Sequence, residues 1–227
     1  MDAQVLFPLL LVLVAAIVIT GAILAWRHER RRREALARLA ASLGFTFNPD
    51  RNHSLARKYQ DLRDLHRGEN RYVFDLIEGR HREVPFSAFD FHYETTSTDN
   101  EGRTRTNHHH LHLIIVHLER EFPNLLIGPE GVFSKIAQAL GFDDIDFESH
   151  EFSRRFCVRS SDRKFAYDFC NARMIELLLA HPHLSLEVRA GVFALVFPGR
   201  MKPDDIQSKL DLAADIREKM PDYLFAA

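Results

Sequence analysis

The chain begins with a long apolar stretch that shows no alternation with polar residues. Val5 to Trp26 is a run of 22 residues without a charge, and its only polar side chain is that of Thr20. An α-helix rises about 1.5 Å per residue, so a helix of this length exceeds the roughly 30 Å hydrocarbon layer of a bilayer. The pattern therefore predicts a membrane-spanning helix.

The residues on either side of this run predict its topology. Asp2 is the only charged residue before it, whereas a cleavable signal peptide, the alternative interpretation, needs positive charge there. Five arginines follow the run: Arg27, Arg30, Arg31, Arg32 and Arg33. Because positively charged flanks stay on the cytoplasmic side, we expect the N-terminus outside the cell and everything after the span in the cytoplasm. The same arginines are expected to contact anionic lipid headgroups.

Small residues inside the span predict a packing face. Gly21 and Ala25 are four residues apart, which is the spacing that lets two spanning helices approach closely. A homo-oligomer that forms through the span is therefore an expected mode of assembly.

The helical pattern continues beyond the arginines. Apolar residues recur at steps of three and four from Ala35 to Leu43, and Gly44 stands where a helix commonly ends. We therefore divide the chain into a transmembrane anchor (1–26), a basic juxtamembrane helix (27–44) and a cytosolic α+β domain (45–227).

Within this domain, apolar residues that alternate with polar ones predict strands. Strands are expected at Tyr72–Ile77, Phe86–Glu94, His108–Leu118 and Leu125–Ile127. Thirteen residues, Thr95 to Asn107, predict a long exposed loop between the second and third of these strands. Helical spacing marks Ser54–His66 and Val132–Leu140.

The final third of the chain repeats the mixture of strands and helices. The expected elements are a strand around Ile145 and Phe147, a strand at Phe152–Arg159, a helix from Asp162 to Ala180, a hairpin of Leu184–Val188 with Val192–Phe197, and a helix that begins at Pro203. A mixed, mostly antiparallel sheet with packed helices indicates the α+β fold class.

The composition is that of a folded protein. Of 227 residues 46% are hydrophobic, and the scarcity of Gly, Pro and Cys excludes a disordered tract, a collagen-like repeat and a disulfide-dense secreted scaffold. Cys157 and Cys170 are expected to be free thiols. The first 34 residues carry a net charge of +2 and the remainder carries −4, so nucleic acid is not an expected partner.

Histidines gather at the start of the third predicted strand. His108, His110 and His112 share one face because side chains alternate along a strand. In a hairpin whose paired residue numbers sum to 202, the cross-strand pairs are Asp90–His112, His92–His110 and Glu94–His108. This arrangement predicts a candidate zinc site formed by His92, His110, His112 and Asp90. Histidine–carboxylate pairs that hold no metal are the alternative.

Known catalytic motifs are absent from the sequence. It contains no G-x-x-x-x-G-K-[ST], G-x-G-x-x-G, G-x-S-x-G or H-E-x-x-H pattern. We therefore predict no catalytic residues and no cofactor other than the zinc ion considered above.

Four segments carry a family resemblance. They are L-A-R-L-A-A-S-L-G-F at Leu36–Phe45, F-D-F-H-Y at Phe89–Tyr93, F-P-N-L-L-I-G-P-E-G at Phe122–Gly131 and D-I-D-F-E-S-H-E-F-S-R-R-F at Asp144–Phe156. With these motifs the chain resembles an uncharacterised bacterial family of often membrane-anchored proteins. The resemblance runs from Leu36 to the last helix and implies a single-pass bacterial inner-membrane protein with a cytosolic α+β domain. It implies no catalytic residues.

Two functions from different classes follow from these observations. The first is a single-pass membrane protein whose cytosolic domain binds an unknown protein or a lipid surface without catalysis. The alternative is a metal-dependent hydrolase or metal sensor that uses the histidines of the hairpin. A structural envelope component that assembles through the span is a third hypothesis.

Overall fold

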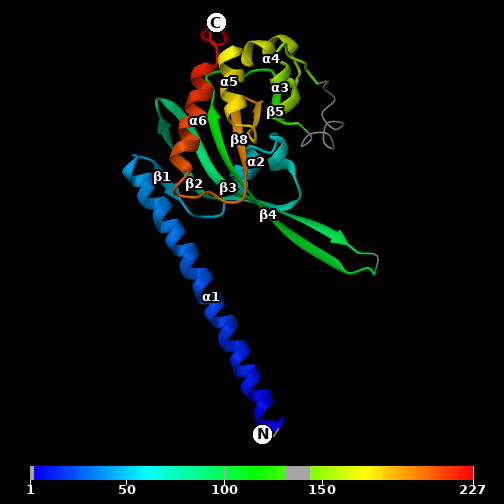
Figure 1. Cartoon of the computed structure of the whole chain (residues 1–227). Coiled ribbons are helices and arrows are strands. Elements are labelled where there is room, and N and C mark those ends of the chain that lie inside the picture. Colours follow the sequence, from blue (N-terminus) through cyan, green and yellow to red (C-terminus); the bar gives the residue numbers. More distant parts are fainter. Residues whose placement is uncertain (1–2, 100, 131–143, 227) are drawn as a thin grey trace.

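The computed structural model of the chain describes residues 3–99, 101–130 and 144–226. The described chain contains one long N-terminal helix and an eight-stranded sheet with helices on both faces (Figure 1). The predicted α+β class is confirmed. Every described strand pairing is antiparallel, so the sheet is more uniform than the mixed sheet expected from the sequence.

Helix α1 (Ala3–Ser42) continues for 40 residues without a break. Its large apolar side chains between Leu10 and Trp26 are 50 to 67% exposed, because no other part of the described protein covers them. By length and composition this part of α1 is a candidate membrane span. Gly44, with φ of +74°, follows the end of the helix, as the sequence predicted.

The eight strands form a single sheet. In spatial order they are β1 (Thr46–Asn48), β2 (Glu69–His81), β3 (Val84–Thr98), β4 (Thr104–His117), β8 (Val192–Pro198), β7 (Ser185–Arg189), β5 (Leu125–Pro129) and β6 (Phe156–Ser160). The predicted hairpin of β7 and β8 is present, and Ala190 and Gly191 form its turn with positive φ angles.

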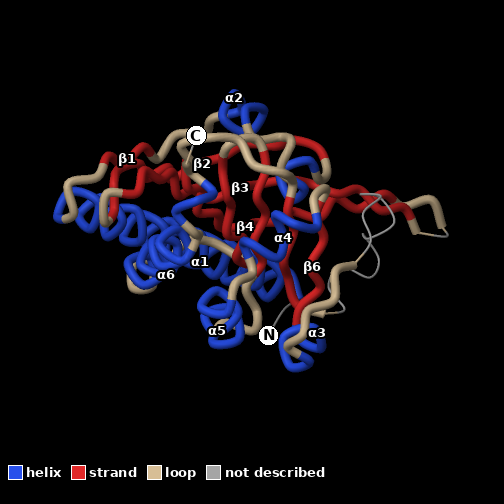
Figure 2. The backbone as a smooth tube through the Cα atoms, turned by 90° about the horizontal axis from the view of Figure 1, so that it is seen from above, coloured by secondary structure: helices blue, strands red, loops and turns tan. Residues whose placement is uncertain are grey.

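Helices cover both faces of the sheet, which Figure 2 shows from above. One face carries the C-terminal part of α1 together with α3 (His150–Arg155), α4 (Arg163–Phe169), α5 (Ala172–Ala180) and α6 (Ile206–Lys219), and the chain ends near the short turn η3 (Asp222–Leu224). The opposite face carries α2 (His53–Lys58) and the short turn η1 (Arg63–His66).

The larger hydrophobic core includes the end of α1. Leu36 is fully buried and Ala40 is 1% exposed, and both belong to the same cluster as Ile77 of β2 and Phe86 of β3. The helix that carries the candidate span is therefore packed into the domain at its other end. No separate linker lies between them.

The register of the β3–β4 hairpin is the one predicted from the sequence. Asp90 pairs with His112, His92 with His110, and Glu94 with His108. The predicted loop is wrong, however, because the two strands continue as a paired arm as far as Thr98 and Thr104. Threonine is β-branched and favours extended backbone, so this polar segment forms strand rather than loop.

Two other predicted helices are divided in the structure. The helix expected at Ser54–His66 is divided into α2 and η1. The helix expected from Asp162 to Ala180 is divided at Asn171, whose side chain accepts a hydrogen bond from the Met174 N–H and so caps a new helix. The predicted helix at Val132–Leu140 lies outside the described residues.

The segment before β6 also differs from its prediction. Residues 150–155 form α3 instead of a strand, because Ser149 caps the helix by accepting from the Phe152 N–H. The strand expected around Ile145 is reduced to an isolated bridge between Asp144 and Arg159.

Candidate functional site

The face of β3 that packs against α1 changes from apolar to polar along the strand. Phe86 and Ala88 belong to the core around α1, and Asp90, His92 and Glu94 follow on the same face because side chains alternate. The polar positions form two adjacent groups with different partners.

The first group, which we call the ionic cluster, joins α1 to the sheet. It consists of Glu29, Arg32 and Arg33 of α1, Asp75 of β2, Asp90 of β3, and Arg200 in the loop after β8. Three carboxylates therefore meet three guanidinium groups at the point where α1 leaves the domain.

Arginine side chains bridge the parts of this cluster. Arg32 pairs with both Asp75 and Asp90, and its Nη1 lies 3.2 Å from Asp90 Oδ2. Arg200 holds Glu29 with two hydrogen bonds, of 2.7 and 2.8 Å, in the fork geometry that suits a carboxylate. Two arginines thus tie the juxtamembrane part of α1 to β2, β3 and the Arg200 loop.

Asp75 reaches this cluster through an irregularity of β2. In a regular strand Asp75 would point away from its neighbour Phe74, yet both contact Arg200. The register shifts between Phe74 and Ile77, and Asp75 has φ of +52°. The bulge turns the Asp75 carboxylate, which has no exposed surface, toward α1.

Both carboxylate oxygens of Asp90 have partners in or next to the ionic cluster. Its side chain is fully buried, and its Oδ1 accepts a 2.6 Å hydrogen bond from the Met201 N–H. Burial raises the pKa of Asp90 to about 6, although the Met201 N–H and the guanidinium groups of Arg32 and Arg200 counteract part of this rise. Its oxygens already have partners, which leaves them poorly placed as metal ligands.

His112, across the hairpin from Asp90, is also enclosed. Its side chain is fully buried, its ring stacks on Phe197 with centroids 5.6 Å apart, and its Nδ1 lies 3.3 Å from the carbonyl oxygen of Phe89. Burial lowers the pKa of His112 to about 3, so the ring is neutral at physiological pH.

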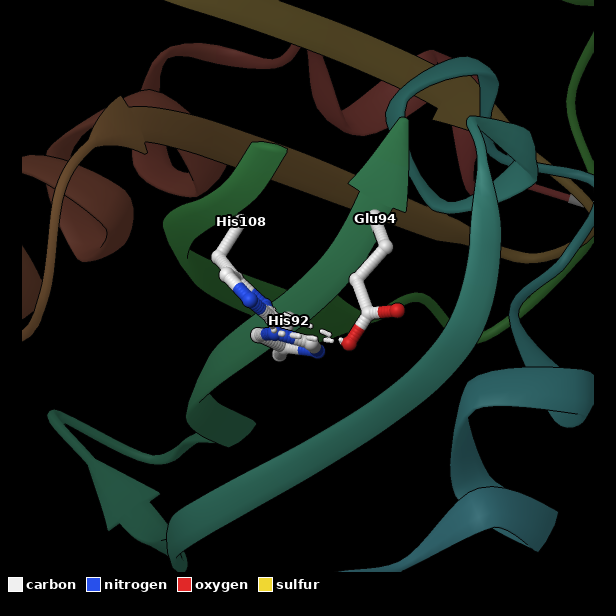
Figure 3. A group of neighbouring side chains, drawn as sticks. All are labelled: His92, Glu94 and His108. Carbon is white, nitrogen blue, oxygen red and sulfur yellow. Dashed lines mark hydrogen bonds and ion pairs between the residues drawn. The ribbon is translucent and has the colours of Figure 1, made fainter. Parts of the chain in front are cut away.

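The second group, which we call the histidine cluster, lies further along the hairpin. His92 and Glu94 come from β3 and His108 comes from β4, and Figure 3 shows their side chains directed toward one another. His92 Nε2 lies 3.2 Å from His108 Nδ1, and Glu94 Oε1 lies 3.3 Å from His108 Nδ1 and 3.8 Å from His92 Nε2.

These distances match a tetrahedral metal site. Zinc bonds of about 2.0–2.1 Å to nitrogen and oxygen place neighbouring ligand atoms about 3.3 Å apart. His110 lies beside this set, with its ring centroid 5.1 Å from that of His92 and a buried Nδ1 that makes no hydrogen bond within the described chain. Burial lowers the pKa of His110, and the neighbouring His92 and Arg200 lower it further.

The structure therefore brings together only part of the predicted zinc set. His92 and His110 are neighbours, whereas Asp90 and His112 belong to the enclosed region next to α1. Among the described residues, the group whose ligand atoms converge is His92, Glu94 and His108.

A cavity of about 240 Å³ lies next to the ionic cluster, three of whose residues line it, and we call it the arginine pocket. Its walls are Glu29 and Arg33 of α1, Tyr72 and Phe74 of β2, His110 of β4, and the loop residues Arg51 and Arg200. Arg51 stacks over the ring of Tyr72 at 4.6 Å, and Arg200 stacks over the ring of Phe74 at 5.0 Å.

The five arginines after the span differ in their surroundings. Arg27, Arg30 and Arg31 are exposed, and Arg30 pairs with Glu34 at 2.8 Å. Arg32 has only 11% of its side chain exposed and pairs with buried carboxylates within the domain. Arg33 is 42% exposed and pairs with Glu29 and Asp75. Lipid contact by the five arginines stays a prediction.

The predicted packing face of the span is free in the described chain. Gly21 and Ala25 are exposed, and no atom lies within 4 Å of the position that a Cβ would take at Gly21. This leaves room for a second helix, and the structure holds a single copy of the chain.

Four residues of the ionic cluster and the arginine pocket were not predicted, namely Glu29, Asp75, Arg51 and Arg200. Glu94 and His108 were paired by the predicted register but were not part of the predicted zinc set. In a regular strand the alternation of side chains would direct Asp75 to the opposite face of the sheet, and the bulge turns it toward α1. Arg51 and Arg200 stand in loops, where no periodic pattern shows which face a side chain will reach. Their positions next to Pro or Gly turns were the only available signal.

Comparisons with known proteins identify a distant structural neighbour. No protein-family model and no curated protein sequence matches the chain. The fold is similar to the crystal structure of the mycobacterial trehalose monomycolate transport factor A, TtfA, with a TM-score of 0.57 and 13% sequence identity. The similarity covers 84% of this chain and 95% of that chain. At this identity the likeness is one of fold, so the expected bacterial family stays a prediction.

Proposed function

We propose that the chain is a single-pass membrane protein whose folded domain binds protein or lipid at the cytoplasmic surface of a bacterial inner membrane, without catalysis. The observation that carries this proposal is the ionic cluster. It fixes the domain to the segment of α1 that directly follows the candidate span.

The connection between span and domain favours a fixed position at the membrane. α1 has no break between Trp26 and the core residue Leu36, and Arg32 is tied to two buried carboxylates in this interval. Buried ion pairs contribute little net stability, but their removal is costly, and they can specify one arrangement of the parts that they join. A domain held in this way meets partners that lie on the same membrane surface.

The structural neighbour is compatible with this role. TtfA is a transport factor, and an accessory protein of membrane transport need not carry a catalytic centre. The positive flank of the span supports a cytoplasmic domain through the charge rule for membrane topology.

Anchoring and topology can be tested together with the full chain. Reporter fusions at the C-terminus should be active only in the cytoplasm, and mass spectrometry should find residues 1–26 retained in the mature protein. A mature N-terminus beyond Trp26, or activity only outside the cytoplasm, would contradict the proposal.

Binding can be tested by photo-crosslinking in native membranes. A photoreactive residue in place of Arg105, which is exposed on the hairpin arm, should give a defined protein or lipid adduct. The matched control replaces Arg173, an exposed arginine of α5, and should not give that adduct. No adduct from either position, together with turnover of a small molecule by the purified chain, would favour an enzyme instead.

A zinc-dependent hydrolase or metal sensor is the second candidate, and the convergence of His92, Glu94 and His108 favours it. These three side chains would hold the ion and leave a fourth position for water or a substrate, which is the arrangement of catalytic zinc sites. When bound, the ion would supply an activated water or a signal of metal concentration.

Zinc titration of the full chain in detergent tests this candidate. Calorimetry should detect one site, and His92→Ala or His108→Ala should weaken binding at least tenfold. His183→Ala is the matched control because His183 is exposed and lies outside the hairpin. Unchanged affinity in both cluster variants, or no heat of binding in the parent chain, would exclude this site.

A further inference from the structure

The α1 wall of the arginine pocket begins at the depth of lipid headgroups if α1 spans the membrane. Glu29 and Arg33 stand three and seven residues beyond Trp26, which is about 4.5 and 10.5 Å along the helix axis. Each polar layer of a bilayer is roughly 5–7 Å thick outside the hydrocarbon. The α1 wall of the pocket therefore begins within the layer that contains the lipid phosphates.

The charge of the pocket favours an anion. The three arginines of the ionic cluster are balanced by its three carboxylates, but Arg51 stands outside that cluster and has no ion pair within the described chain. Its guanidinium lies over the ring of Tyr72 at 4.6 Å. Stacking uses the face of the guanidinium and leaves its N–H groups able to donate hydrogen bonds. One guanidinium in the wall of this pocket is thus available to an anionic ligand.

A second arginine lies beside Arg51 in the wall of the pocket. Arg200 stacks over Phe74, two residues along β2 from Tyr72, and lines the same cavity. The two guanidinium groups therefore rest on successive aromatic rings of one strand face. The Arg200 N–H groups donate to Glu29 and Asp75, so the donors that can match the oxygens of a phosphate are those of Arg51.

The size of the cavity favours a lipid headgroup over an acyl chain as its ligand. Its volume of about 240 Å³ is below the range of about 300–1,000 Å³ that is common for pockets that bind whole small ligands. Its charged and histidine walls also give no continuous apolar lining for a hydrocarbon chain.

We propose that the arginine pocket binds the phosphate of an anionic phospholipid headgroup, with Arg51 as its guanidinium donor and Arg200, which is held by Glu29 and Asp75, in the wall beside it. This inference rests on the proposed function, because only a membrane-anchored chain brings the pocket to the lipid surface. It names the lipid class that the domain recognises and the residue that recognises it.

Lipid retention by the full chain tests the proposal. The parent protein, purified in detergent and titrated with phosphatidylglycerol or phosphatidylcholine, should retain the anionic lipid preferentially in native mass spectrometry. Arg51→Gln should weaken phosphatidylglycerol binding about fivefold, which corresponds to the ~1 kcal/mol of one arginine near an anionic surface. Arg51 is exposed, so this variant should keep the thermal stability of the parent.

The control variant and the probes separate the outcomes. Arg173→Gln removes an exposed arginine of α5 and should leave lipid binding unchanged. Equal phosphatidylglycerol binding by the parent and Arg51→Gln would overturn the proposal. Binding of inorganic phosphate that depends on Arg51 but is not displaced by phosphatidylglycerol would also overturn it, because the ligand would then be a free phosphate.

Failure of the proposed function has a different signature. If the chain is not anchored, alkaline carbonate will release the parent protein and both variants from membranes alike. If the chain is anchored but the pocket has another role, all three proteins will stay in the membrane pellet and will retain phosphatidylglycerol equally.

Discussion

The ionic cluster and the histidine cluster lie on the same face of β3, yet they are used differently. Asp90 is fully buried and has an N–H donor and two arginines as partners. His92 is two residues further along, and it faces Glu94 and His108 with ligand atoms that converge on one point. Charged groups that pair with one another join parts of the structure, whereas converging nitrogen and oxygen ligand atoms can bind a metal ion.

The cause of this difference is what covers each group. α1 and the loop that contains Arg200 lie over the ionic cluster. The histidine cluster lies on the β3–β4 hairpin, whose arm extends from the domain and diverges from α1 (Figure 1). Of its members, His108 has 62% of its side chain exposed, so a solvated ion can reach it.

The largest expected effect comes from breaking the ionic cluster. Asp75→Ala should destabilise the full chain in detergent by about 3–5 kcal/mol, because it leaves the arginines of α1 without a buried carboxylate partner. Denaturant unfolding followed by circular dichroism measures this loss.

The matched control for this change is Asp99→Ala in the exposed tip of the hairpin. Asp99 pairs with Arg103 on the surface, and its removal should cost less than ~1 kcal/mol. Equal losses in the two variants would show that the ionic cluster does not hold α1 to the sheet.

A smaller effect is expected from the pH dependence of His112. Its pKa falls from an ordinary value of 6.5 to about 3 on folding, so the unfolded chain binds more protons between these pH values. The contribution of His112 to stability is therefore complete above pH 6.5 and decreases as the pH falls toward 3.

His112→Phe should reduce this dependence. Asp90 has the opposite effect, because its raised pKa adds stability as the pH falls from about 6 toward 4 in both proteins. The difference in the free energy of unfolding between parent and variant should therefore change by about 1 to 2 kcal/mol between pH 6.5 and pH 5. Denaturant unfolding at both pH values measures it. A difference that is independent of pH would show that His112 is not buried as a neutral ring.

The smallest effect is expected in the histidine cluster without metal. His108→Ala should change the free energy of unfolding by less than ~1 kcal/mol in the presence of a chelator, since its ion pair with Glu94 is largely solvated. Thermal unfolding with and without zinc measures the contrast. A large loss of stability in the presence of the chelator would show that the histidine cluster stabilises the fold without metal, as the ionic cluster does.

The hairpin register predicted from the sequence places apolar positions of β3 and β4 on a common face. Phe89 with Leu113 and Phe91 with Leu111 are the apolar pairs of that register, and the structure has both. The same reasoning fails for Asp75, since a bulge changes the face of a residue without changing its local pattern. It also fails at residues 150–155, where the Ser149 cap favours a helix over the strand that the apolar residues suggested.

The unbroken course of α1 links the angular position of the domain to that of the candidate span. Each residue of an α-helix advances the chain by about 100° around the axis. One residue inserted between Trp26 and Glu29 would therefore turn the whole sheet by more than a quarter of a revolution relative to residues 10–26. The number of residues between these two parts of α1 thus decides which side of the sheet is aligned with a given side of the apolar segment.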